Sequence, residues 1–152
     1  MIAITTTDLT PLCDAEDVLY TAIVLDEDSQ DKILSIVPPF EHGKEFGHHV
    51  TLAFKPNQDH VDALDFGKRV SFNARAIVMN SKCIAVEVEL PEGVTSSNKH
   101  PHVTICTRNG VPPVYSNQLL EDNSNGLGHD GLTEYPLQNM VLNGRVECKM
   151  KS

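Results

Sequence analysis

The sequence predicts one α+β domain with largely antiparallel sheets. The chain has 152 residues, a length typical of a single domain that can bury a sizeable core. Stretches rich in β-branched residues recur along it, and stretches with helical periodicity separate some of them. Two strand-like stretches follow each other across a three-residue turn, a pattern typical of an antiparallel hairpin. We therefore expect a single domain over residues 1–152, in which residues 1–17 form an N-terminal extension.

The first half of the chain predicts two strands and two helices. Residues 19–25, LYTAIVL, form a β-branched apolar run that predicts a strand. Residues 26–37 carry Asp and Ser at plausible N-cap positions and apolar residues at helical spacing, and the prolines after them would end that helix. Residues 48–54, HHVTLAF, alternate and predict a second strand, and residues 59–66 predict a short helix.

The second half predicts mostly strands. Residues 69–79 and 83–90 are two β-rich runs separated by NSK, which indicates a hairpin with a short loop. Residues 102–107, HVTICT, predict another strand after a polar loop. Residues 114–122 predict a short helix within a segment rich in Gly, Pro and Asn. Residues 137–150 predict a last strand or hairpin.

The charge of the chain limits the kind of ligand that it can bind. The formal net charge is −9, and the Lys and Arg residues are scattered along the sequence. Proteins that grip long nucleic acids normally present a basic stripe, because neutralisation of phosphates drives their affinity. We therefore expect no long nucleic acid as a partner, and any nucleotide ligand should be small.

The sequence also bears on the compartment. No apolar run approaches the length needed to span a membrane, and the first residues lack the pattern of a signal peptide. The four cysteines, Cys13, Cys83, Cys106 and Cys148, are widely spaced and include no CxxC pair. Without a secretion signal, we expect all four to be reduced thiols. We therefore expect a cytoplasmic protein with no membrane partner.

A short motif occurs twice in the chain: a His, an apolar residue, a Thr and another apolar residue. The first copy places His49 before Thr51, and the second places His102 before Thr104. Two such copies have chance odds of roughly one in a hundred at this composition. Since alternate side chains of a strand share a face, each copy puts its His and Thr on one face and its apolar residues on the other. The pattern predicts a core face and a functional face on each strand.

If the two strands lie near each other, the two imidazoles and two hydroxyls converge in one groove. One His could then act as general base and the other as general acid, while Thr51 and Thr104 bind phosphate oxygens. Histidine suits both roles because its ordinary pKa lies near neutrality. The residues leave open whether His49 or His102 is the base. Since neither zinc-type spacing nor a carboxylate cluster accompanies the motifs, we expect no metal and no other cofactor.

Two further histidines lie beside the motifs. His48 precedes His49, and strand alternation would point it to the opposite face. His100 lies two residues before His102 and could border the groove.

The two motifs, together with LYTAIVL at residues 19–25 and NGRVE at residues 143–147, resemble segments of the two-histidine (2H) phosphoesterases. The resemblance spans roughly residues 18–150. It implies a bilobal fold of mostly antiparallel sheets with flanking helices. It also implies that Tyr20 stacks on a base at the groove and that Glu147 contacts the substrate. The chain has no Trp, whereas a base-stacking Trp is expected in a loop facing the groove, so Phe or Tyr would have to replace it.

Within this superfamily the segments are most similar to the phage anti-CBASS nucleases, which destroy cyclic oligonucleotide signals of host antiviral defence. The resemblance implies a metal-independent phosphodiesterase that cuts 3′-5′ bonds of cyclic di- or trinucleotides in the host cytoplasm. One alternative is an RNA-end or 2′-5′ oligonucleotide phosphoesterase with the same residues, against which the net charge of −9 argues. Another is a module that sequesters nucleotides without cleaving them, although binding alone needs no matched acid and base.

Overall fold

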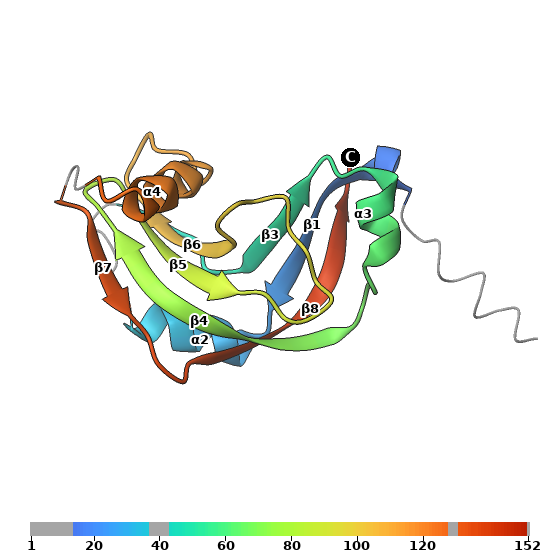
Figure 1. Ribbon diagram of the computed structural model, residues 1–152, viewed down its shortest axis with the longest axis horizontal. Helices are drawn as coiled ribbons and strands as arrows, with labels where there is room; N and C mark the ends of the chain where they lie inside the picture. The colour runs from blue at the N-terminus through green and yellow to red at the C-terminus, as the bar shows by residue number, and fades with distance from the viewer. Residues whose placement is uncertain (1–13, 37–42, 128–130, 152) are drawn as a thin grey trace, which may run out of the picture.

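The computed structural model describes residues 14–36, 43–127 and 131–151. The predicted α+β class is confirmed: short helices accompany a largely antiparallel set of strands (Figure 1). Most of the expected N-terminal extension lies outside the described residues. The strands are β1 (Val18–Leu25), β2 (Lys44–Glu45), β3 (His49–Phe54), β4 (Arg69–Met79), β5 (Cys83–Glu89), β6 (His102–Thr107), β7 (Thr133–Pro136) and β8 (Val141–Met150). The helices are the 3₁₀ turn η1 (Ala15–Asp17) and the α-helices α2 (Glu27–Ile36), α3 (Gln58–Ala63) and α4 (Tyr115–Ser124).

Six strands and three helices lie where the sequence predicts them, and two short strands were not predicted. β2 consists of a Lys and a Glu, and β7 ends at Pro136, so neither carries the β-branched pattern of a strand. Both lie beside a longer strand, β2 beside β6 and β7 beside β4. Their conformation therefore depends on a partner that is distant in the sequence.

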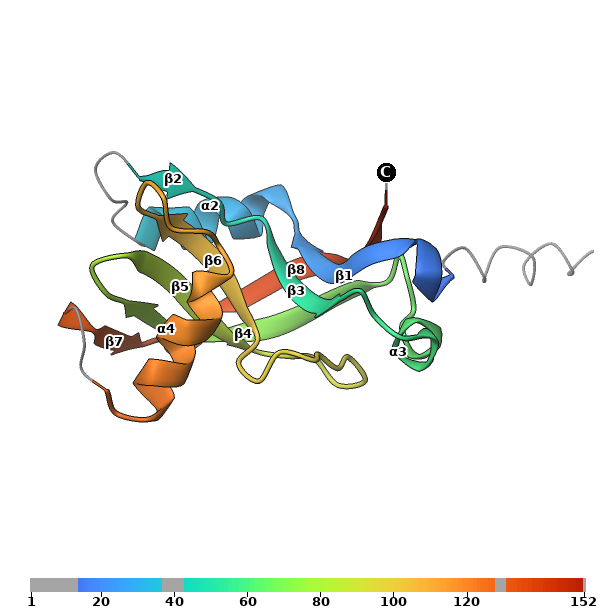
Figure 2. The ribbon, with the colours of Figure 1, turned by 90° about the horizontal axis from the view of Figure 1, so that it is seen from above.

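The long strands close into a ring. The order is β6-β3-β1-β8-β4-β5, every pairing is antiparallel, and β5 pairs in turn with β6. The strands thus form one closed antiparallel barrel, and the antiparallel pairing agrees with the expected bilobal fold of mostly antiparallel sheets. The cause of the closure is β4, whose first residues (69–73) pair with β8 and whose later residues (73–79) pair with β5. This one bent strand carries the sheet from one side of the barrel to the other (Figure 2).

Alternate side chains along the strands point into the barrel and fill it. Ile23, Val50, Leu52, Val103 and Ile105 point inward and are essentially inaccessible to solvent. Burial of each such side chain contributes about 1.5–3 kcal/mol. The opposite face of β3 and β6 is therefore left for the two His-Thr motifs, as the alternation predicts.

The helices cover only part of the outer surface. α4 packs Leu119 and Leu120 against the outward side chains Val78 and Ala85 of β4 and β5. α2 contributes Ile33 to the main core. Because α4 lies over β4 and β5, the outer face of β3, β1 and β8 stays open beside it (Figure 1). None of the helices among the described residues is long and apolar enough to cross a membrane.

α3 is tied to the end of β1. His60 Nε2 lies 2.8 Å from the hydroxyl of the buried Thr21, and Val61 packs against Val18. The helix begins where the side chain of Asn57 accepts a hydrogen bond from the His60 backbone N–H.

The cysteines differ from the expectation of four reduced thiols. Cys83 and Cys106 are free and buried. Cys148, however, is disulfide-bonded, so the expectation is wrong at this position. Wide spacing in the sequence does not preclude such a bond, since folding brings together cysteines that are distant in the chain.

Candidate active site

A single pair of residues joins the two motifs. β3 and β6 pair at Val50 and Val103, the apolar residues at the centre of each motif. Both valines point into the core, so the motif residues on either side of them point outward together. In an antiparallel pair with this register, His49 lies on the Thr104 side and Thr51 on the His102 side. The two motifs thus meet crosswise on one face.

Beyond this pair the two strands separate, and a loop takes over the hydrogen bonds. The carbonyl of Leu52 accepts from the Ser97 backbone N–H at 2.7 Å and from the Ser96 hydroxyl at 2.7 Å. The carbonyl of Thr51 accepts from the side-chain amide of Asn98 at 3.2 Å. These contacts satisfy strand groups that would otherwise lack a partner, because β6 no longer lies beside them.

His102 is held firmly in place. Only 8% of its surface is exposed, and its Nδ1–H donates to the backbone carbonyl of His100 at 2.7 Å. This bond sets the tautomer of the neutral ring, so its Nε2 carries the lone pair. Burial lowers the pKa of His102, while the His100 carbonyl and the carboxylate of Glu87, its partner across β5 and β6, act in the opposite direction.

The His100 ring, which we expected could border the groove, faces elsewhere. Its Nε2 lies 2.9 Å from Glu121 Oε2, and its Nδ1 lies 3.4 Å from Glu87 Oε2. The ring is therefore clamped between two carboxylates on α4 and β5, and His100 acts on the site through its backbone carbonyl.

His49 is held by stacking. Its ring lies against Tyr20 of β1, with ring centroids 5.5 Å apart and an angle of 19° between the planes. Burial, followed by the nearby His48 and His102, lowers the pKa of His49. Tyr20 thus lies at the groove, where the resemblance places it, and it contacts a motif histidine directly.

Thr104 joins a chain of hydroxyl and thiol groups whose other two members, Ser116 and Cys83, are buried. Its Oγ1 lies 2.8 Å from the hydroxyl of Ser116 at the start of α4, and Ser116 lies 3.3 Å from Cys83 Sγ. Burial raises the pKa of the Cys83 thiol to about 11, so the thiol keeps its proton and can donate to Ser116. Ser116 can then donate to Thr104, whose own hydroxyl proton has the Pro113 carbonyl as an acceptor at 3.5 Å, a long bond that a phosphate oxygen in the groove could replace.

The groove is a pocket of about 770 Å³ that contains all four motif residues. Its remaining lining was not predicted from the sequence, apart from Tyr20. It comprises Phe46, His48, Phe54, Asn98, Pro112, Pro113, Val114 and Asn117. The three aromatic residues at the pocket, Tyr20, Phe46 and Phe54, are those that could stack on a base in this Trp-free chain.

The expectation that His48 faces away from the groove is wrong. His48 lies in a bend before β3 begins, so strand alternation does not apply to it, and its side chain lines the pocket. Its Nδ1 lies 3.4 Å from the Gln30 side chain of α2. Of the other lining residues, Asn98 comes from the loop before β6, and Pro112, Pro113 and Val114 come from the turn before α4. The composition of these two segments carries no signal for a site.

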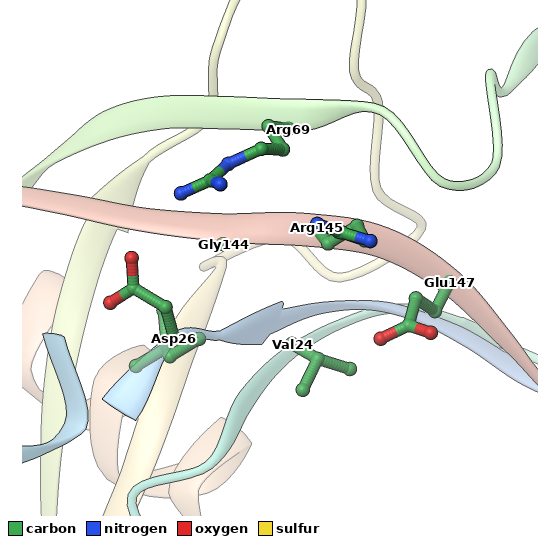
Figure 3. A pocket seen from close by; sticks show the side chains of 7 residues that line it. Val24, Asp26, Arg69, Gly144, Arg145 and Glu147 are labelled. Atoms are coloured by element: carbon green, nitrogen blue, oxygen red, sulfur yellow. The ribbon is translucent and has the colours of Figure 1, made fainter. Parts of the chain in front are cut away.

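Glu147, the second expected substrate contact, lines a neighbouring pocket. That pocket has a volume of about 260 Å³ and is also lined by Val24, Asp26, Arg69 and Arg145 (Figure 3). Glu147 pairs across β8 and β1 with Ala22, which pairs in turn with Thr51. Partners in a ladder point to the same face, so Glu147 shares the open outer face with Thr51, although the two line different pockets.

Among the residues that the structure describes, no group of three or more His, Cys, Asp and Glu side chains is placed to hold a metal ion. The chemistry that the large pocket itself offers consists of three imidazoles, two threonine hydroxyls, two side-chain amides and aromatic surfaces.

Comparisons with known proteins place this chain in a family. The profile of the family described as the fungal tRNA ligase phosphodiesterase domain matches residues 42–150, which include both motifs. No curated protein sequence matches the chain. Among solved structures, a crystal structure of fungal RNA kinase is similar with a TM-score of 0.63 and 20% sequence identity, which indicates a shared fold. The similarity covers 92% of this chain and 47% of that one, so this chain spans about half the length of that protein. Because the profile covers most of the sequence, the chain belongs to the fungal tRNA ligase phosphodiesterase domain family.

Proposed function

We propose that this protein is a two-histidine phosphodiesterase that opens 2′,3′-cyclic phosphates at the ends of RNA. The observation that carries the proposal is the pairing of Val50 with Val103, which brings two His-Thr motifs into one pocket. Membership of a tRNA ligase phosphodiesterase family supports RNA ends over cyclic oligonucleotides, which only the resemblance to anti-CBASS nucleases favours. The RNA-end alternative is therefore preferred.

We assign His102 as the general base. Its Nδ1–H is committed to the His100 carbonyl, so the neutral ring presents a lone pair at Nε2. Burial keeps this neutral form dominant near neutral pH by lowering the pKa of His102. The base would remove a proton from a water molecule, whose oxygen attacks phosphorus.

His49 is then the general acid. It would donate its proton to the ribose oxygen that leaves phosphorus as the ring opens. Burial lowers the pKa of His49 in the free protein, but a bound phosphate anion favours the imidazolium form. After turnover His102 carries the extra proton and His49 lacks one, and exchange with solvent resets both rings.

The hydroxyls of Thr51 and Thr104 would hold the two nonbridging phosphate oxygens. Charge grows on these oxygens as the attacking oxygen joins phosphorus, so donors aimed at them lower the barrier. Thr104 is oriented for this task by Ser116 and Cys83 behind it. The base of the terminal nucleotide would stack on Tyr20 or on the exposed Phe54, which is 60% accessible.

The net charge of −9 argues against an RNA ligand that lies along the surface, but it is compatible with an RNA that engages the protein through its end only. An extended RNA would need a basic track along the surface. We accordingly propose short RNA termini as the ligand and no long nucleic acid.

The test is a panel of substrates incubated with purified protein, in chelator and without it. The panel contains nucleoside 2′,3′-cyclic phosphates, short RNAs with a 2′,3′-cyclic phosphate end, 2′-5′ linked dinucleotides, and cyclic di- and trinucleotides. Mass spectrometry should find one added water on the cyclic-phosphate ends, equally with EDTA present. Preferential opening of the cyclic di- or trinucleotides would instead support the anti-CBASS function. Binding without turnover of any of them would point to a sequestering module.

A further inference from the structure

A second pocket shares the open outer face with the active site. Its volume is about 260 Å³, and its charged lining consists of Arg69 on β4, Arg145 and Glu147 on β8, and Asp26 after β1 (Figure 3). Neither the sequence patterns nor the family match assigns a role to the two arginines.

Strand register places these arginines in one line with a motif histidine. His49 pairs with Val24, Val24 pairs with Arg145, and Arg145 pairs with Arg69. Partners in adjacent antiparallel strands point to the same face, so all four side chains lie on the outer face. Two strand spacings separate His49 from Arg145, or about 10 Å between backbones. One nucleotide can span that distance, since an arginine side chain reaches out from its strand.

The two guanidinium groups are only partly neutralised within the protein. Both arginines are exposed, and neither has a carboxylate within ion-pair distance among the residues that the structure describes. The charge of Arg69 does act on Asp26, because it adds to the hydrogen bonds from Ser29 in lowering the pKa of that carboxyl. Like charges directly opposite each other on two strands repel, so the pairing of Arg69 with Arg145 is unfavourable in the absence of an anion. A phosphate between them would relieve this repulsion, and guanidinium groups bind phosphate oxygens with paired N–H bonds.

The two carboxylates at the pocket restrict what the arginines can hold. Asp26 accepts a hydrogen bond from the Ser29 backbone N–H at 2.8 Å, so its carboxylate caps the first turn of α2. The carboxylate of Glu147 points toward β1, away from the Arg69 side chain (Figure 3). With two cations and two anions, the pocket suits one phosphate group better than a run of them. Glu147 remains free to accept a hydrogen bond from a ribose hydroxyl or a base N–H.

We propose that Arg69 and Arg145 bind the phosphate on the 5′ side of the nucleotide whose 2′,3′-cyclic phosphate occupies the active site. The exposed Val24, which lies between His49 and Arg145, would contact the sugar that joins the two phosphates. The inference rests on the proposed function, because it uses the active site as the anchor for the other end of the nucleotide. It explains how an acidic protein recognises a chain end through a single additional phosphate.

The test compares two substrates that differ by one group: a nucleoside 2′,3′-cyclic phosphate with and without a 5′-phosphate. The wild-type protein should show a higher kcat/KM for the substrate with the 5′-phosphate. In Arg69→Ala and Arg145→Ala this preference should fall about tenfold, the value of one charged hydrogen bond. Arg145→Lys keeps the positive charge but loses the paired N–H donors of the guanidinium group. Its preference for the 5′-phosphate should therefore lie between those of the wild type and Arg145→Ala. Lys68→Ala removes a neighbouring positive charge and should keep the full preference.

Turnover and binding separate the two ways in which the proposal can fail. If neither substrate is opened, the proposed function is wrong. The dissociation constants of nucleoside 3′-phosphates with and without a 5′-phosphate then test the arginines directly by calorimetry. If both substrates are opened and the arginine variants keep the wild-type preference, the inference is overturned while the function stands. An equal loss of the preference in Lys68→Ala would also overturn the inference, since the overall positive charge of this region, and not the two arginines, would then explain the effect.

Discussion

The two His-Thr motifs have almost the same sequence and very different surroundings. Both side chains of the β6 motif are held by hydrogen bonds within the protein. His102 donates to the His100 carbonyl, and Thr104 is hydrogen-bonded to the Ser116 hydroxyl. In the β3 motif, His49 is held by stacking on Tyr20, and the Thr51 hydroxyl bonds to none of the residues that the structure describes.

This difference in surroundings supports the proposal that the two copies of the motif have different roles. A ring with one nitrogen committed to a backbone carbonyl has a defined tautomer, which suits a base that must present a lone pair. A ring held by stacking keeps both nitrogens available, which suits an acid that must reload its proton from solvent. The sequence leaves this assignment open, and the surroundings of the two motifs favour His102 as the base.

The largest expected effect comes from removing either ring. His49→Ala and His102→Ala should each lower kcat/KM for cyclic-phosphate opening by about 10²–10⁴-fold, since each removes one half of the acid-base pair. Steady-state rates measure this, with circular dichroism as the control for folding. A loss smaller than tenfold in either variant would mean that the two motifs are not an acid-base pair.

A smaller and unequal effect is expected from the threonines. Thr51→Val and Thr104→Val should each lower kcat/KM by about tenfold to a hundredfold, because each removes a donor to the phosphate. Only Thr104→Val should also lower the free energy of unfolding, by about 1 kcal/mol, because it removes a partner of the buried Ser116.

Denaturant unfolding measures the stability part of this comparison. Ser116→Ala is its matched variant: it should weaken activity only a few fold, since Thr104 keeps its hydroxyl but loses its orienting partner. Equal stabilities of Thr51→Val and Thr104→Val would contradict the contrast between the β6 motif, whose side chains are hydrogen-bonded within the protein, and the β3 motif, whose Thr51 hydroxyl is not.

The smallest effect is the pH dependence of stability. Burial lowers the pKa of His49 and of His102 below the ordinary value of 6.5, so the unfolded chain binds protons in a range where the folded protein does not. The free energy of unfolding should therefore fall as the pH drops from 6.5 through the lowered pKa values, and it should level off above 6.5.

Unfolding by urea at several pH values measures this slope. His60, whose pKa burial also lowers, contributes in the same direction, so the variants His49→Asn and His102→Asn should each flatten the slope without abolishing it. A protein that becomes more stable as the pH falls below 6.5 would show that the rings are protonated in the folded state.

Local patterns in the sequence were enough to predict the principal strands, the helices and the outward direction of His49, Thr51, His102 and Thr104. The reason is that strand alternation and helix periodicity depend on neighbours in the chain. The same patterns mispredicted His48, which precedes the strand, and gave no sign of β2 and β7, whose strand conformation depends on remote partners.

Only the tertiary structure decided what meets at the site. The pairing of Val50 with Val103 unites two motifs that are 53 residues apart (103 − 50 = 53). The closure of the barrel through β4 sets Arg69 and Arg145 in line with His49. The turn before α4 and the loop before β6 complete the pocket with residues of no distinctive pattern. The sequence by itself determined which way each strand residue points, because that is a local property of the backbone. Which residues face one another depends on the register between distant strands, and the packing of the whole core sets that register.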